Sequence, residues 1–317
     1  MLALLATGCS ELQARRHARA GNGHYLEGDY AGAVREYELA QEKHPGLFVV
    51  ELNKGLACRQ LMQPGSKSAE QQRAVDCAVG SFTKMKELRP DDPRGDQLYI
   101  QTLFDGDRYD TLAAIYEAQL QKDPKNLAAI NGLISVHSRA DHWAEALKWT
   151  MTRADIDASD AEEQYAVGVM IFNRLYQKGG ADKGAFDPRP DPNEVPPPKV
   201  VKRRGKKVAA APPPPPGKMP PPFTVGDVMG SERARLADIG LDYLQRAMKI
   251  RANYREAMGF LSLLYRQKSF AYLEKPQEWE PLFNAANEWQ AKANQAATVP
   301  PTPSAPAPSS PPVSTPS

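Results

Sequence analysis

The chain has 317 residues, of which 41% are hydrophobic and 25% charged, and its formal net charge is only +2. The hydrophobic content suffices for a solenoid core of modest width. The small net charge excludes a polyanion-binding role that rests on the charge of the whole chain. Beyond the first ten residues, no segment approaches the ~20 apolar residues of a membrane-spanning helix. Helix-forming residues are plentiful and runs of β-branched residues are scarce, so the composition predicts an all-α fold.

The first ten residues, MLALLATGCS, form a short apolar run that ends at Cys9. Together with its small residues, this run resembles the lipobox of bacterial lipoproteins, whose cysteine receives the lipid. It lacks a basic stretch and is shorter than an ordinary signal peptide, and a start codon annotated too far downstream would explain both features. Ser10 is similar to the residue of lipoproteins that are sent to the outer membrane. We therefore expect a signal-like segment at 1–10 and a lipid anchor at Cys9 on the periplasmic face of that membrane; the alternative is a ragged start of the first helix.

A characteristic spacing follows, in which Gly28-Asp29-Tyr30 precedes Ala33, Tyr37, Ala40 and Pro45. Gly28 and Asp29 suit a turn between helices, the two alanines let helices touch, and Pro45 ends the second helix. This order resembles the second half of a tetratricopeptide repeat (TPR), a pair of antiparallel helices that recurs about every 34 residues. The resemblance implies a right-handed α-solenoid that binds other proteins and does no chemistry.

The same spacing recurs along the chain. Pro90 and Pro124 close a second and a third unit and lie 34 residues apart. The step from Pro45 to Pro90 is 45 residues, and we assign the excess of 11 to a polar insertion at Met62–Gln72. The residues that take the places of Ala33, Tyr37 and Ala40 in units two to four include Ala78, Phe82, Met85, Tyr116 and Ala146.

In the second half of the chain, helix A of a fifth unit is expected at Tyr165–Ile171, but its partner does not follow at once. A proline-rich segment without helical periodicity intervenes, and the pattern resumes near Leu236. A sixth unit opens at Tyr254, and its second helix is expected at Glu278–Gln295. We therefore expect about six TPR helix pairs at residues 11–178 and 231–295, a disordered insert at 179–230 and a disordered tail at 296–317.

The insert is strongly basic. It carries seven cations and no acid between Val195 and Gly226, so the rest of the chain sums to about −5. A block of this kind can bind nucleic acid or anionic lipid, or thread along the cell wall, and a solubilising loop without a partner is the alternative. Nucleic acid is the weaker expectation, because no aromatic residues interleave with the cations. The cations expected to act are Lys202, Arg203, Arg204, Lys206 and Lys207.

Three residues on the first helices of units one to three, Asn22, Asn53 and Arg94, lie at matching places. Some TPR proteins that capture a peptide's C-terminal carboxylate use asparagines and basic residues there. Ala18 and Leu98 stand where two of those cations are expected, and a clamp without its full charge loses most of its charge-assisted bonds. The pattern thus favours a generic groove in which Asn22 and Asn53 hydrogen-bond to the backbone of an extended peptide.

The two remaining cysteines, Cys58 and Cys77, lie on the two helices of the second unit. They either form a disulfide, which suits an oxidising periplasm, or pack as small buried hydrophobes. His17, His24 and His137 are expected to be packing residues on inward stripes and not metal ligands.

No catalytic set is recognisable, because the chain lacks a Gly-rich phosphate loop, a nucleophile elbow and an HExxH sequence. We therefore expect no enzymatic activity, no cofactor and no metal. The chain resembles pilotin-like TPR lipoproteins, and this resemblance implies a scaffold or assembly factor with protein or peptide clients at an outer-membrane assembly. The alternative is a soluble cytoplasmic TPR adaptor whose basic insert binds nucleic acid or other anionic partners.

Overall fold

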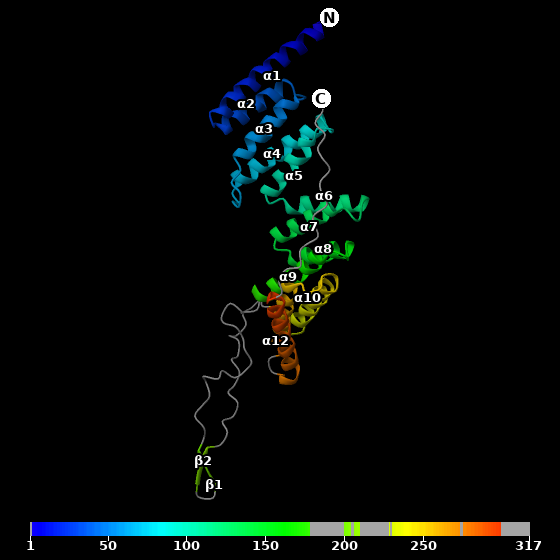
Figure 1. The fold of residues 1–317 in the computed structure, drawn as a ribbon. Coiled ribbons are helices and arrows are strands. Elements are labelled where there is room, and N and C mark those ends of the chain that lie inside the picture. The colour runs from blue at the N-terminus through cyan, green and yellow to red at the C-terminus, as the bar shows by residue number, and fades with distance from the viewer. Residues whose placement is uncertain are drawn as a thin grey trace. The chain divides into compact units, whose positions relative to one another are not determined.

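The structure is a computed structural model, and it describes residues 2–177, 200–203, 206–209, 228, 230–272 and 275–298. These residues form twelve α-helices that pack largely as consecutive pairs, which confirms the expected all-α array of TPR-like helix pairs (Figure 1). None of the helices in these ranges is long and apolar enough to span a membrane. The chain divides into two compact units, residues 1–149 and 150–317.

The first unit contains seven helices and the start of an eighth. They are α1 (Leu2–Leu26), α2 (Tyr30–Lys43), α3 (Phe48–Gln60), α4 (Ala69–Leu88), α5 (Pro93–Asp105), α6 (Tyr109–Lys122), α7 (Leu127–Arg139) and α8 (Trp143–Ile156). The second unit contains the end of α8, then α9 (Ala161–Gln177), α10 (Gly230–Ile250), α11 (Arg255–Ser269), a 3-10 helix at Phe270–Tyr272 and α12 (Pro276–Thr298).

The turns before α2, α6 and α8 follow one rule. Gly28 has a left-handed backbone with φ of 82°, and Asp29 caps α2 by accepting a hydrogen bond from the Gly32 amide at 2.8 Å. Asp107 and Asp141 stand at the same distance before α6 and α8, with φ of 57° and 56°. Aspartate tolerates this conformation better than most residues, because its short polar side chain can bond locally. The turns before α6 and α8 therefore keep the left-handed conformation although aspartate replaces glycine there.

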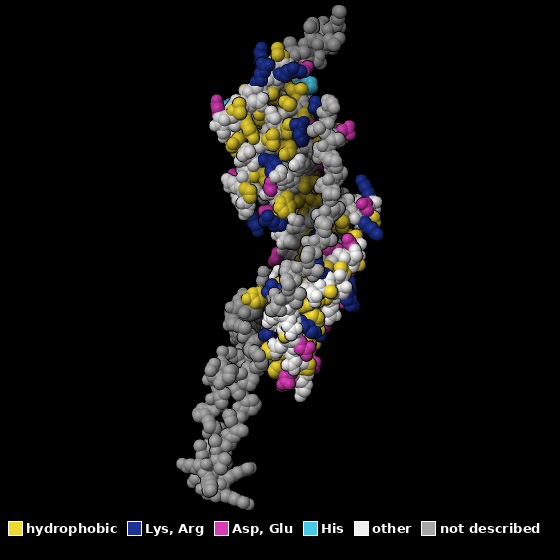
Figure 2. Space-filling view, viewed as in Figure 1, with side chains coloured by type: hydrophobic (Ala, Val, Ile, Leu, Met, Phe, Trp, Pro, Cys, Tyr) yellow, Lys and Arg dark blue, Asp and Glu magenta, His cyan; other side chains and the backbone are white. Residues whose placement is uncertain are grey.

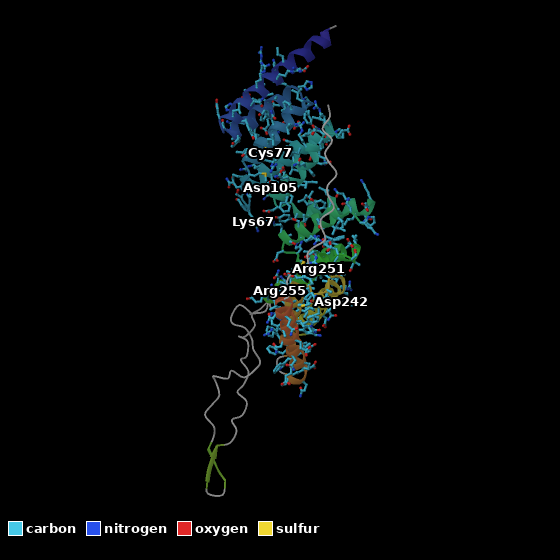
Figure 3. The ribbon with its side chains drawn as sticks, in the orientation of Figure 1. Lys67, Cys77, Asp105, Asp242, Arg251 and Arg255 are labelled. Carbon is cyan, nitrogen blue, oxygen red and sulfur yellow. A yellow bond between two sulfur atoms is a disulfide. The ribbon has the colours of Figure 1, made fainter. Side chains whose placement is uncertain are left out.

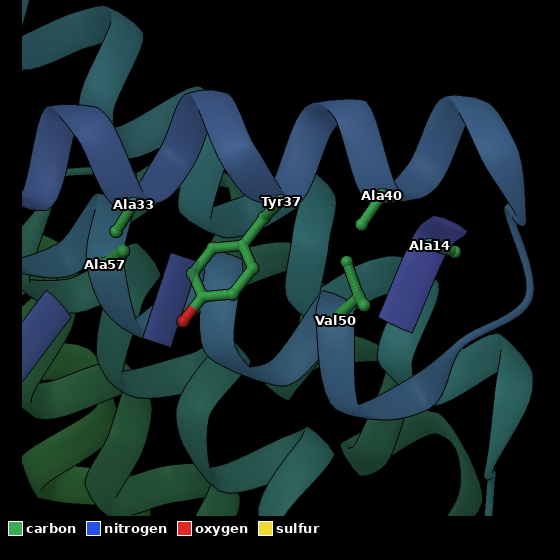
Figure 4. Close-up of a cluster of buried hydrophobic side chains, with 6 residues drawn as sticks. All are labelled: Ala14, Ala33, Tyr37, Ala40, Val50 and Ala57. Atoms are coloured by element: carbon green, nitrogen blue, oxygen red, sulfur yellow. The ribbon is translucent and has the colours of Figure 1, made fainter. Parts of the chain in front are cut away.

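The core repeats a contact between an aromatic ring and a glycine. In the first pair, buried Tyr37 packs among five small or branched side chains, and its ring lies so close to Gly21 that a Cβ there would be 2.6 Å away (Figure 4). Phe82 meets Gly55 in the same way, at 2.5 Å. A missing Cβ on one helix thus makes room for the ring on the next, which allows the close helix packing of this fold. The cluster of Figure 4 contains Ala14, Ala33, Tyr37, Ala40, Val50 and Ala57.

The insertion in the second pair is shorter than the sequence predicted. It comprises residues 61–68 and not 62–72, because α4 begins at Ala69. The physical reason is an N-cap: the Ser68 hydroxyl accepts a hydrogen bond from the Gln71 amide at 3.1 Å. The remaining excess residues lengthen α4 to 20 residues.

At the N-terminus, α1 runs without interruption from Leu2, so the residues that the sequence set apart as signal-like are helical. The side chains of residues 1–9 lie outside the described part of the chain. The lipid anchor at Cys9 therefore stays a prediction.

Within the basic insert, the structure describes a short antiparallel hairpin of β1 (Val200–Arg203) and β2 (Lys206–Ala209), which the sequence did not predict. Most of the expected disordered insert lies outside the described residues, as does the expected disordered tail from residue 299 onwards. The C-terminal helix α12 continues three residues beyond the predicted end at Gln295.

Arg233 of α10 contacts residues on both sides of the insert, and its side chain is fully buried. Its guanidinium donates to the carbonyl of Leu175 near the end of α9 at 3.3 Å and to the carbonyl of Val228 at 2.8 Å. It also donates to Gln267 of α11 at 2.5 Å. These bonds tie residues on the two sides of the insert to one side chain, in addition to the direct packing of α9 against α10.

Candidate peptide-binding groove

A groove of about 680 Å³ crosses the first helices of three successive pairs, α1, α3 and α5. On α1 its residues recur at helical spacing, as Arg15, Arg19 and Asn22, so they share one face. The other residues that line the groove are Ala18, Gly46, Leu47, Phe48, Val49, Val50, Leu52, Leu88, Arg89 and Arg94. We call this space the basic groove, because four arginines line it.

The arginines of the basic groove are only half neutralised. Arg15 pairs with Glu11 at 2.7 Å, and Arg94 pairs with Asp92 at 2.6 Å. Arg19 and Arg89 are exposed and make no ion pair in the part of the chain that the structure describes. The groove therefore carries a net positive charge, which favours an anionic ligand.

Phe48 holds two of these cations in place. The guanidinium carbon of Arg89 lies 4.1 Å from the centroid of the Phe48 ring, and that of Arg94 lies 5.7 Å from it. Arginine stacks well on an aromatic face, because its guanidinium is planar and only weakly hydrated. Phe48 also begins α3, and the N-cap residue Leu47 gives no side-chain hydrogen bond to the first turn. The partial positive charge of this uncapped helix end adds to that of the arginines.

Asp92 sets the position of Arg94. Its carboxylate accepts bonds from the Arg94 backbone N–H at 3.1 Å, from Nε at 2.9 Å and from Nη2 at 2.6 Å. The side-chain bonds from Arg94 are the main cause that lowers the pKa of Asp92 to about 2. The pair stays ionised at any physiological pH. Arg94 therefore has a fixed orientation, and most of its positive charge is already neutralised by Asp92.

The two predicted asparagines meet beside the arginines. Nδ2 of Asn53 donates to Oδ1 of Asn22 at 2.9 Å, and Oη of Tyr37 donates to the same oxygen at 2.7 Å. The Asn22 amide N–H groups are left without a partner among the described residues. They can donate to the carbonyl of a bound backbone.

Past Asn22 the surface becomes apolar. A pocket of about 280 Å³ is lined by Asn22, Tyr25, Leu26, Tyr37, Asn53 and Leu56. It shares Asn22 with the basic groove, so the two spaces adjoin, and Leu26 is 86% exposed. Figure 2 shows hydrophobic side chains and Lys and Arg side chains together on one face of this unit. We call the smaller space the apolar pocket.

Of the residues that the sequence suggested for a peptide groove, Asn22 and Arg94 line the basic groove and Asn53 lines the apolar pocket; their role in binding stays a prediction. Arg19, Arg89 and Phe48 were not suggested by the sequence. Arg15, Arg19, Asn22 and Leu26 recur at spacings of three and four, and this stripe was a usable signal for α1. Arg89 follows the end of α4, where no periodicity marks it, so only the fold brings it over Phe48. Of the positions that lack the expected cations, Ala18 lines the groove and Leu98 packs against the cluster around Phe82.

The two histidines of α1 are partly buried and face α2. Nδ1 of His17 lies 2.8 Å from Glu36 of α2, and that of His24 lies 3.0 Å from Asp29, the N-cap residue of α2. His137 is partly buried and has an Nδ1 atom without a hydrogen-bond partner. The described residues contain no group of side chains that could hold a metal ion.

The two inner cysteines are bonded to each other. A disulfide joins Cys58 of α3 to Cys77 of α4, with the two Cα atoms 5.9 Å apart (Figure 3, where Cys77 is labelled). The next residue on α3, Arg59, bonds to Asp105 of α5 at 2.8 Å. These two links fix α3 between its neighbours, and α3 is the central helix of the basic groove.

Four of the five insert cations lie in the hairpin. Lys202 is registered opposite Lys207 and Arg203 opposite Lys206, while Arg204 lies outside the described residues. Binding by the insert stays a prediction.

Comparison with protein-family models finds no match, and comparison with curated proteins finds none either. Among solved structures, the chain is similar to "MamA 41-end from Desulfovibrio magneticus RS-1", at 15% identity and a TM-score of 0.32, over 51% of this chain and 85% of that one. It is also similar to YrrB, titled "a TPR protein with an unusual peptide-binding site", at 12% identity and a TM-score of 0.32, over 83% and 98% of the two chains. A human IFIT1 dimer with m7Gppp-AAAA matches at 12% identity and a TM-score of 0.25, over 87% of this chain and 59% of that one.

Proposed function

We propose that this chain is a non-enzymatic scaffold that binds an extended, acidic peptide segment of a partner protein along α1, α3 and α5. The observation that carries the proposal is a pair of exposed arginines, Arg19 and Arg89, that make no ion pair with any described residue. They lie beside Asn22, whose amide N–H groups have no partner among the same residues. Charge-assisted bonds from arginine to carboxylate are stronger than neutral ones. The groove is thus suited to a carboxylate ligand even though it lacks two cations of the clamp that the sequence suggested.

The two adjoining spaces give the ligand a direction. Acidic side chains or a C-terminal carboxylate lie against Arg19, Arg89 and the start of α3. A carbonyl group of the peptide backbone accepts a hydrogen bond from the Asn22 amide. An apolar side chain of the peptide enters the apolar pocket at Tyr25, Leu26 and Leu56. From Arg19 to Leu26 the helix rises about 10 Å, which an extended peptide covers in about three residues.

The test is a titration of the full chain with a fluorescein-labelled peptide, Glu-Glu-Ser-Ser-Leu, at low salt. We expect Arg19→Glu and Arg89→Glu each to weaken binding about tenfold or more, because each turns an attraction into a repulsion. Arg16→Glu is the matched control: it lies on α1, is exposed and does not line the groove. Equal weakening by Arg16→Glu, or tight binding of a Lys-Lys-Ser-Ser-Leu peptide, would contradict a specific groove.

We further propose that the scaffold is an assembly factor anchored by a lipid on Cys9 to the periplasmic face of the bacterial outer membrane. The Cys58–Cys77 disulfide supports this location, because such bonds persist in oxidising compartments. The lipobox-like residues before Cys9 support the anchor.

A further inference from the structure

Five aromatic rings form a continuous strip across α9 and α11 of the second unit. Consecutive ring centroids are 5.1 Å apart from Tyr254 to Tyr165, 5.5 Å from Tyr165 to Phe260, 5.3 Å from Phe260 to Phe172 and 5.5 Å from Phe172 to Tyr176. Tyr254 is buried, Tyr165, Phe260 and Phe172 are partly exposed, and Tyr176 is 41% exposed. We call this set the aromatic strip.

The aromatic strip is separate from the core of its own helix. On α9 the core face carries Val167, Ile171 and Leu175, each fully buried. Tyr165, Phe172 and Tyr176 recur at spacings of seven and four and remain accessible. On this second face the rings of α9 pack against those of α11 and still stay partly exposed, and accessible apolar patches of this kind mark sites of interaction.

The rings are held in fixed orientations. Phe260 stands edge-on to Tyr165 at 83° and to Phe172 at 82°. Oη of Tyr254 donates to Glu162 at 2.6 Å, and Arg251 donates to the same carboxylate at 2.7 Å. A row of preformed aromatic surfaces is the feature that binds polyproline II helices, which lose little conformational entropy on binding.

The chain itself contains a segment with this chemistry. Residues 299–317 include eight prolines and no charged side chain. The prolines of the insert, in contrast, are interleaved with seven cations. An uncharged proline-rich segment suits an aromatic surface without an electrostatic penalty, so the C-terminal segment is the better match.

Its point of attachment is also suitable. The helix α12 ends at Thr298 and packs against α11, the helix that contributes Tyr254 and Phe260. Helices joined by a short connection run antiparallel, so the end of α12 points toward the end of α11 where Tyr254 lies. At about 3.1 Å per residue, a polyproline II segment of 19 residues reaches about 59 Å, several times the spacing between neighbouring rings. A short tether also gives a millimolar effective concentration, which makes even weak docking productive.

We infer that residues 299–317 dock as a polyproline II helix on the aromatic strip of their own chain. The strip is thus a proline-recognition surface, distinct from the basic groove that takes an acidic peptide.

The experiment places a nitroxide spin label on the full chain at Ser309→Cys, in a Cys9→Ser background with the native disulfide intact. We expect the label to broaden the aromatic NMR signals of Tyr165, Phe172 and Tyr176. Replacing Pro306, Pro308 and Pro311 by alanine should abolish the broadening while the other signals stay unchanged. Phe172→Leu, which keeps an apolar side chain but removes the ring, should weaken it at Tyr165 and Tyr176.

Three outcomes would overturn the inference. The first is sharp signals from all rings of the strip. The second is broadening that survives the proline substitutions, since the recognised feature would then not be polyproline. The third is broadening seen only when spin-labelled, unenriched protein is mixed with unlabelled, isotope-enriched protein, because the segment would then dock on a second copy.

Discussion

Asn22 and Asn53 lie 31 residues apart in the sequence and share a hydrogen bond of 2.9 Å, so the first helices of two successive pairs meet at matching positions. The Asn22 oxygen also accepts from Tyr37, the buried ring at the centre of the first pair. One acceptor thus connects the core of the repeat to the surface of the groove.

This connection predicts an order of stabilities. Tyr37→Phe removes one hydrogen bond and should lower the free energy of unfolding by about 0.5–1.5 kcal/mol. Asn22→Ala should cost more, about 1–3 kcal/mol, because it leaves the Tyr37 hydroxyl buried without an acceptor. Urea denaturation followed by circular dichroism measures both. A larger loss of stability in Tyr37→Phe than in Asn22→Ala would show that the Asn22 oxygen is not the acceptor on which the Tyr37 hydroxyl depends.

The glycine opposite Phe82 should resist substitution. A Cβ at Gly55 would lie 2.5 Å from the Phe82 ring, so we expect Gly55→Ala to destabilise the protein by about 1–3 kcal/mol. Gly80→Ala on α4 is the matched control, since a Cβ there meets nothing within 4 Å. It should stabilise the protein by about 0.5–1 kcal/mol, the usual gain of alanine over glycine within a helix. Thermal melting of the two variants should therefore shift in opposite directions.

The disulfide should contribute strongly to stability. It closes a loop with a sequence separation of 19, for which the chain-entropy model gives about 3 kcal/mol. The double variant Cys58→Ala, Cys77→Ala should lose about this much in urea denaturation. Dithiothreitol should lower the wild type to the same level and leave the double variant unchanged. A wild type that is indifferent to the reductant would contradict this contribution.

Glu51 predicts a pH dependence. Its side chain is buried, and desolvation raises the pKa of its carboxyl above the ordinary value of 4.5. The folded state therefore holds this proton more tightly than the unfolded state, so stability from this group is present below pH 4.5 and is lost as the pH rises through the raised folded value. Glu51→Gln should raise the melting temperature at pH 7, and the gain should vanish near pH 4. The exposed Glu42→Gln serves as the matched control for the loss of one carboxylate.

The proposed anchor predicts a change of location. Expressed in a bacterial host with its native upstream sequence, the wild type should sediment with membranes, and Cys9→Ser should move it to the soluble fraction, because a diacylated terminus inserts strongly. Ser10→Ala should keep the membrane association. A wild type that is already soluble would refute the lipid anchor.

The sequence by itself determined the class of fold. The spacing of Ala33, Tyr37 and Ala40 and its recurrence at Ala78, Phe82 and Met85 predicted helix pairs, and all six residues are buried. This was possible because neighbouring helices in a repeat pack through contacts at fixed short separations, so the periodicity of small and aromatic residues records them directly. Even the insertions were located correctly between two helices, although a serine cap moved the start of α4.

Only the tertiary structure decided where arginine side chains and accessible aromatic rings gather on the surface. Arg89 reaches Phe48 from beyond the end of α4, and the aromatic strip alternates between two helices that are separated by the insert and α10. No local periodicity encodes such juxtapositions, because they depend on how successive helices are rotated against each other. The sequence therefore specified the repeating core, whereas the positions of unpaired charge and accessible rings emerged only when the helices were packed together.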